Sequence, residues 1–148
     1  MKKYIYILLI VWTSAAFAQD KKLGLGFMLG NPTGINGKYW LDSEKAVDGG
    51  VGASLGRHSE FSIHSDYLLH NFNALYLNDI YALDLYYGLG GRLEFSDSIE
   101  LGIRVPVGLV YQVKEKSAEV FSEVAPILDF IGREGLELHL AVGGRYYF

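Results

Sequence analysis

The feature that most constrains the fold is a strict alternation of apolar with polar or small residues along much of the chain. From Ile99 to Val113 every odd-numbered residue is apolar, and the even-numbered residues include Glu100, Gly102 and Arg104. A period of two is the period of a β-strand with one apolar face. After Leu23 no apolar stripe of helical spacing is long enough to predict a helix. The sequence therefore predicts an all-β fold.

Turn-like clusters divide the alternating region into eight segments. These are residues 22–30, 34–41, 46–55, 60–70, 80–95, 99–113, 118–130 and 136–148, and only the connector 71–79 is long. The apolar face is odd-numbered in the first six segments and even-numbered in the last two. A hairpin joining Val113 to Ala118 would keep the odd-numbered apolar residues before it and the even-numbered apolar residues after it on the same face of the sheet. Most segments have the ~9–11 residues of a membrane-spanning strand. We predict an eight-stranded antiparallel up-and-down transmembrane β-barrel.

The first eighteen residues have the pattern of a cleaved secretory signal peptide: two lysines, an apolar run and a small-x-small ending, Ala16-Phe17-Ala18. The apolar run of nine residues, from Tyr4 to Trp12, is far shorter than the ~20 residues of a transmembrane helix. We expect residues 1–18 to be removed and residues 19–148 to form one barrel domain.

Composition excludes several classes of function. The chain has no cysteine, so disulfides, thiolate metal sites and cysteine nucleophiles are excluded. Its formal net charge is −4, which argues against nucleic acid as a partner.

Glycine indicates which face points inward. Eleven strand glycines (Gly24, Gly26, Gly30, Gly34, Gly50, Gly52, Gly88, Gly90, Gly102, Gly108 and Gly143) share a face with the charged residues, whereas Gly37, Gly49, Gly91 and Gly144 lie on the apolar face. A narrow barrel interior needs small residues beside large polar ones. We therefore expect the apolar face to contact lipid.

The two faces then define two sets of candidate residues. We predict an interior polar network of Lys38, His64, Asp66, Asp84, Arg92, Glu94, Glu100, Arg104, Glu123, Glu137, His139 and Arg145, accompanied by Asp48 and Glu119. Aromatic residues of the apolar face are predicted at the membrane interfaces: Tyr39, Tyr67, Tyr81, Tyr111, Tyr146 and Phe148 on the periplasmic side, and Phe61, Phe95 and Phe130 on the other.

The chain ends Arg145-Tyr146-Tyr147-Phe148 after an alternating apolar segment. This segment resembles the last strand of bacterial outer-membrane barrels, and the size and segment number resemble the OmpA/OmpX-like class. The motifs Gly30-Asn31-Pro32-Thr33-Gly34 and Arg104-Val105-Pro106-Val107-Gly108 resemble a narrower family of small outer-membrane barrels that carries no established activity. The resemblance implies outer-membrane location, Tyr146 and Phe148 as the insertion signal, and the insertion machinery and outer-membrane lipids as partners.

We expect a monomeric, non-enzymatic outer-membrane protein with an envelope-structural or surface-contact role, without cofactor or metal. One alternative is a secreted or periplasmic barrel that carries a lipid, with the apolar face inward. A less favoured alternative is a lipid-modifying esterase, because Ser62, His64 and Asp66 point the same way on one strand. The histidines His64, His70 and His139 have no diagnostic metal spacing.

Overall fold

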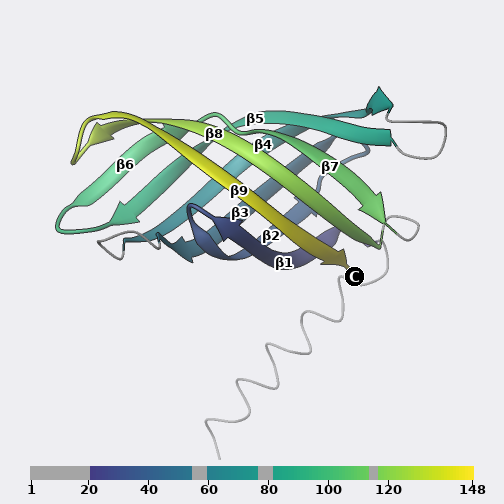
Figure 1. Cartoon of the computed structure of the whole chain (residues 1–148), viewed down its shortest axis with the longest axis horizontal. Coiled ribbons are helices and arrows are strands. Elements are labelled where there is room, and N and C mark those ends of the chain that lie inside the picture. The colour runs from purple at the N-terminus through teal and green to yellow at the C-terminus, as the bar shows by residue number, and fades with distance from the viewer. Residues whose placement is uncertain (1–20, 55–59, 77–81, 114–116) are drawn as a thin grey trace, which may run out of the picture.

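The structure is a computed structural model that describes residues 21–54, 60–76, 82–113 and 117–148. These residues form nine β-strands (Figure 1): β1 (Leu23–Gly30), β2 (Thr33–Trp40), β3 (Lys45–Ala53), β4 (Phe61–Tyr76), β5 (Ala82–Phe95), β6 (Ile99–Arg104), β7 (Val107–Val113), β8 (Ala118–Ile131) and β9 (Gly135–Tyr147). The all-β prediction is confirmed for this part of the chain. The predicted signal peptide lies outside the described residues.

Among the described residues, no helix has the length and apolar character needed to cross a membrane.

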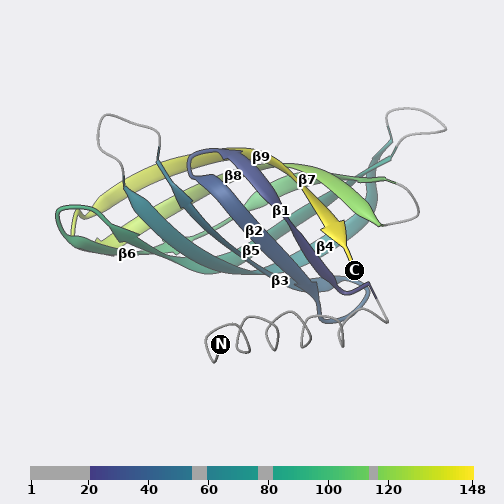
Figure 2. The same ribbon diagram turned by 90° about the horizontal axis from the view of Figure 1, so that it is seen from below.

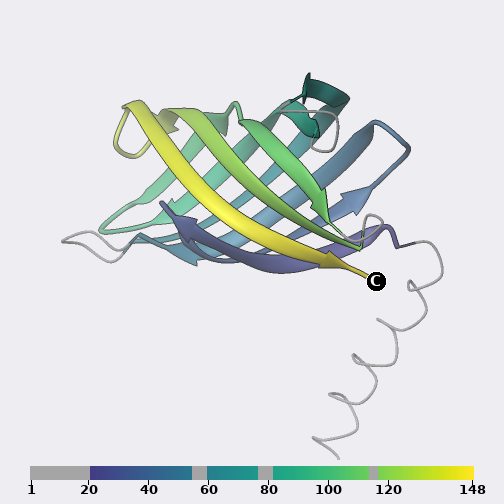
Figure 3. The same cartoon turned by 45° about the vertical axis from the view of Figure 1, so that its right-hand side comes forward.

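All strand pairings are antiparallel, and they return to their starting point. β1 pairs with both β2 and β9, and the series continues through β3, β4, β5 and β8. β6 and β7 both lie between β5 and β8. Figure 2 shows β1 to β3 side by side, and Figure 3 shows the long β8 and β9 beside β7. Each described strand therefore has neighbours on both edges.

The expected count of eight strands is wrong by one, because segment 99–113 is divided into β6 and β7 at Val105-Pro106. Proline has no N–H to donate to the sheet, so it interrupts regular pairing. The register continues across the break, with Arg104 opposite Gly90 and Val107 opposite Tyr87. The two strands thus occupy a single position in the circuit.

The other segment boundaries agree with the structure to within two residues, except at the end of β4. Residues 71–76, expected in a long connector, instead extend β4 to Tyr76, with a bulge against β5 between Asn71 and Leu75. The rings of Phe72 and Trp40 lie 5.9 Å apart. This packing contact stabilises the extended part of β4, and the alternation pattern alone did not predict it.

The sheet has two chemically opposite faces, which we call the inner and outer faces. Seventeen polar or charged residues are buried on the inner face, whereas Phe27 and Leu138 on the outer face are 71% and 56% exposed. Val113 pairs with Ala118, so the outer face changes from odd to even positions there, as predicted.

The eleven glycines predicted for the inner face differ in packing from the four on the outer face. At each of the eleven, a Cβ atom would lie closer than 3.0 Å to another atom, whereas at Gly37, Gly49, Gly91 and Gly144 nothing lies closer than 3.2 Å. At Gly26 the obstruction is the backbone of β9, and at Gly108 it is the ring of Tyr86. The inner glycines therefore let strands and large side chains approach one another inside the sheet.

Candidate functional site: a buried charged network

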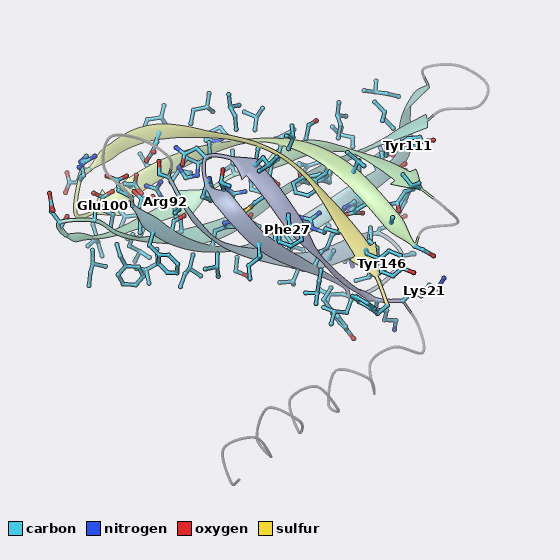
Figure 4. The ribbon with its side chains drawn as sticks, turned by 60° about the horizontal axis from the view of Figure 1, so that its bottom comes forward. Lys21, Phe27, Arg92, Glu100, Tyr111 and Tyr146 are labelled. Carbon is cyan, nitrogen blue, oxygen red and sulfur yellow. The ribbon has the colours of Figure 1, made fainter. Side chains whose placement is uncertain are left out.

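The twelve predicted network residues lie on the inner face. All are buried except Glu137, whose side chain is 38% exposed. They separate into a distal cluster around Arg92, near the turns 96–98 and 132–134, and a central cluster around Arg104 and Arg145. Figure 4 places Arg92 and Glu100 near one end of the molecule and Tyr146 near the other. We call these the distal and terminal ends.

In the distal cluster, one guanidinium is surrounded by four carboxylates. Arg92 Nη2 donates to Asp129 Oδ2 at 2.6 Å, and Nη1 donates to Glu137 Oε2 at 2.8 Å and Glu94 Oε2 at 3.2 Å. Glu100 Oε2, from the neighbouring strand β6, lies 4.0 Å from Nη2. These contacts link β5 to β6, β8 and β9.

Contacts made by His139 and Arg133 connect the distal cluster to the surface of the molecule. His139 Nε2 lies 2.9 Å from Arg92 Nη1 and 3.3 Å from a Glu137 oxygen. The exposed Arg133 guanidinium lies 3.9 Å from Glu60 and 3.8 Å from Glu100. Among the described residues, the distal cluster thus contains more carboxylates than bases, and the exposed Arg133 lies beside it.

In the central cluster, Arg104 on β6 binds carboxylates from strands β4 and β8. Its Nε donates to Asp66 Oδ2 at 2.7 Å, and its Nη2 donates to Glu123 Oε1. The other Glu123 oxygen accepts a hydrogen bond of 2.7 Å from the Tyr86 hydroxyl. Charge-assisted bonds of this kind are stronger than neutral ones, so they brace β4, β5, β6 and β8 against one another.

Arg145 makes the longest connections along the chain. It donates to Asn36 Oδ1 at 2.9 Å, Glu119 Oε1 at 2.7 Å and Asp48 Oδ2 at 3.1 Å. Lys38 Nζ donates to the same Glu119 carboxylate at 3.3 Å. These contacts hold β2, β3, β8 and β9 together.

An aromatic layer lies between the central cluster and the terminal end. The Lys38 ammonium is 4.3 Å from the Trp40 ring centroid and 2.8 Å from His70 Nε2. The His70 ring lies 4.4 Å from Trp40, 6.1 Å from Phe72 and 5.4 Å from Tyr86. Large rings therefore pack the interior beside the charged groups.

The sequence prediction omitted several members of the network. Asp129 binds Arg92 and Tyr86 binds Glu123, yet neither was predicted. Both have the parity of the inner face, so the alternation contained the signal. Asn36, which accepts from Arg145, also has inner-face parity.

The network has more acids than bases. Eight buried carboxyl groups, on Asp48, Asp66, Asp84, Glu94, Glu100, Glu119, Glu123 and Asp129, accompany four buried bases, Lys38, Arg92, Arg104 and Arg145. Buried charge must be balanced by opposite charge or neutralised. The interior therefore has a formal excess of four negative charges among the described residues.

The arrangement of Ser62, His64 and Asp66 does not match a hydrolytic triad. Asp66 Oδ2 accepts from Arg104, and Asp66 Oδ1 has no hydrogen-bond partner. Hence the carboxylate is not bonded to the histidine that it would have to orient. This geometry gives the esterase alternative no support.

Most of the predicted interface aromatics are exposed on the outer face. Tyr39, Phe61, Tyr67, Phe95, Phe130, Tyr146 and Phe148 are exposed, Tyr111 is partly buried, and Tyr81 lies outside the described residues. The rings of Phe61 and Phe95 lie 6.1 Å apart near the distal end, and those of Tyr146 and Phe148 lie 5.4 Å apart near the terminal end. Tyr67 instead lies within β4, opposite Leu89.

Neither a scan of the chain against protein-family models nor a search of curated protein sequences finds a match.

Proposed function

We propose that this chain is an integral outer-membrane protein: a transmembrane β-barrel with eight strand positions and an interior filled by a charged network. Its proposed role is non-enzymatic, in envelope structure or surface contact. The resemblance of its last strand to outer-membrane barrels supports the choice of membrane.

One observation carries this proposal: the usual partition of residues between inside and outside is inverted. Among the described residues, twenty-nine large apolar side chains are exposed, whereas nine apolar residues, two of them alanines, are buried. The buried set also includes Lys38, Arg92 and Arg104 at 2% exposure or less. Water-soluble monomers rarely expose contiguous apolar surfaces of this extent. An apolar outer band around a polar interior is instead typical of membrane barrels.

The circuit of pairings supports the same conclusion. In a bilayer, each backbone N–H and C=O needs a partner within the protein, which for strands requires a sheet without open edges. Each described strand here is paired on both edges. Exposed aromatics near both ends, such as Phe95 and Tyr146, suit the membrane interfaces.

The lipid-carrier alternative requires an apolar interior. The inner face instead carries the charged clusters, and the central cavity is lined by Asp48, His64, Arg104, Glu123 and Arg145, among others. That cavity measures about 10 Å³, room for roughly one water molecule. An acyl chain would not fit there, so the burial pattern favours the membrane proposal.

Cysteine labelling tests both location and sidedness, because the native chain contains no cysteine. Single cysteines replace Arg133 in the distal turn, Glu44 in the turn between β2 and β3, and Leu140 on the outer face. In intact cells a membrane-impermeant maleimide should label Arg133→Cys alone. Glu44→Cys should react only after the outer membrane is permeabilised, and Leu140→Cys only after the protein is unfolded.

Fractionation and heat-dependent gel mobility complete the test. The protein should sediment with outer membranes and migrate differently before and after boiling. Recovery of the folded chain in the soluble periplasm, without detergent and with Leu140→Cys reactive, would overturn the proposal. Labelling of Glu44→Cys but not Arg133→Cys in intact cells would reverse the proposed sidedness.

A further inference from the structure

Three buried side chains of the central cluster converge from two neighbouring strands. Asp48 lies on β3, and His64 and Asp66 lie on β4, with Asp48 directly opposite Asp66 in the register. One ligand atom from each, two carboxylate oxygens and an imidazole nitrogen, lies within 4.8 Å of the others. Such an arrangement brings together the donor types that bind divalent transition metals.

Both carboxylates have one oxygen held and one oxygen unused. Arg145 binds Asp48 Oδ2 and Arg104 binds Asp66 Oδ2, whereas Oδ1 of each aspartate is buried without a hydrogen-bond partner. Asp48 and Asp66 are only 3% and 1% exposed. A buried acceptor without a partner destabilises the fold, and more so when it is charged. Two carboxylates that each keep one unsatisfied oxygen, grouped with one histidine, indicate a ligand that satisfies both.

The space beside Asp48 and His64 suits a small ion; Asp66 does not line this space but lies directly opposite Asp48 in the register. The central cavity, of about 10 Å³, extends from Asp48 and His64 to Asn31 and Pro32 in the turn between β1 and β2. Asn31 Oδ1 is also buried without a partner. The turn therefore provides a further unsatisfied oxygen at the cavity.

The charge of the network also suits a cation. The interior carries four more carboxyl groups than bases among its buried described residues. A divalent ion would halve that excess. The two arginines bind these carboxylates through Oδ2 and thereby orient them, as outer-shell groups do in metal sites.

We propose that Asp48, His64 and Asp66 form a binding site for one divalent transition-metal ion, with Zn²⁺ as the representative. Metal–ligand bonds of about 2.1 Å place neighbouring tetrahedral ligands about 3.4 Å apart. Small side-chain rotations bring the three atoms to that spacing. A water molecule or Asn31 Oδ1 completes the coordination. Sequence spacing did not indicate this site, because Asp48 and Asp66 are far apart along the chain and become neighbours only through the pairing of β3 with β4.

The test uses the untagged chain, folded in detergent micelles and freed of metal by chelation. Calorimetric titration with Zn²⁺ should give one saturable site per chain, and Mg²⁺ should not compete. Co²⁺ should give a visible d–d absorption band on binding, which reports coordination directly. His64→Gln and Asp66→Asn should each weaken Zn²⁺ binding at least ~100-fold, since even outer-shell partners contribute about 10–100-fold.

The matched control is His70→Gln, which alters another buried histidine of β4 and should leave Zn²⁺ affinity unchanged. Heat-dependent gel mobility verifies that each variant is folded, and Asp48→Asn serves in place of any variant that is not. The proposal is overturned if the native chain shows neither saturable Zn²⁺ binding nor a Co²⁺ band. It is equally overturned if the site variants bind as the native chain does, or if His70→Gln weakens binding as much as His64→Gln.

Discussion

Replacing Arg104 with methionine tests whether the charged network stabilises the fold. Arg104 is 2% exposed and binds Asp66 on β4 and Glu123 on β8. Methionine retains much of the side-chain volume but removes both charge-assisted bonds. The variant therefore leaves two carboxylates buried without their base.

The expected loss follows from those two contacts. Hydrogen bonds to charged groups contribute about 1.5–3 kcal/mol each, and breaking a buried ion pair from one side costs about 3–5 kcal/mol. We expect Arg104→Met to lower the free energy of unfolding by about 3–5 kcal/mol. Arg133→Met should lower it by no more than about 1 kcal/mol, because Arg133 is 72% exposed and its nearest carboxylate oxygen is 3.8 Å away.

Urea unfolding of the chain in lipid vesicles measures these free energies. Removal of residues 1–18 leaves Trp40 as the only tryptophan, so its fluorescence reports on the terminal end of the interior. In a double-mutant cycle, Arg104→Met combined with Glu123→Gln should lose less than the sum of the single variants. Equal losses for Arg104→Met and Arg133→Met, both under about 1 kcal/mol, would refute the assigned role of the network.

Three further predictions test the two faces and the last strand. Gly26→Ala should prevent or strongly reduce folding, because its Cβ would meet the β9 backbone, whereas Gly91→Ala, with no atom nearer than 3.8 Å, should fold normally in the same mobility assay. Leu140→Arg, near the middle of β9, should destabilise the chain in vesicles by about 2–4 kcal/mol, and Leu136→Arg, at the start of β9, by about 0–1 kcal/mol; equal costs would contradict a lipid-facing outer surface. Deletion of Phe148 should reduce the amount of heat-modifiable protein in outer membranes without reducing synthesis, and normal assembly would remove its proposed role as an insertion signal.

The alternation in the sequence predicted the two faces because successive side chains of a β-strand always point to opposite sides of the sheet. Lys38 and Leu140 fall on opposite faces in both the pattern and the structure. Local turn residues also placed most strand ends correctly. The division of segment 99–113 at Pro106 was missed because the apolar alternation continues through it without a break. The regular strand pairing nevertheless ends there, because proline has no backbone N–H to donate. The extension of β4 depends on Phe72 meeting Trp40, a contact between distant parts of the chain.

The site was less predictable, because it too depends on contacts between distant parts of the chain. Parity places Asp48, Asp66 and Arg145 on the inner face but does not say which of them touch. Those contacts depend on the register of every strand around the circuit, and a shift by two residues in one hairpin would preserve parity while exchanging partners. Asp129 was overlooked although its parity is correct, and the bulge beside Gly102 sets its alignment with β6.

The partners of Arg145 have a consequence for how the chain assembles. Arg145 is 109 residues from Asn36 and 97 from Asp48 along the chain, and it reaches them from β9, the neighbour of β1. Those two bonds can form only after the first and last strands have met, whereas the bond to Glu119 on the adjacent strand β8 does not depend on that step. A chain arrested before that step would leave Asp48 without the guanidinium that it binds in the finished molecule, so the charge pairing of the interior is completed only when the circuit of strands closes.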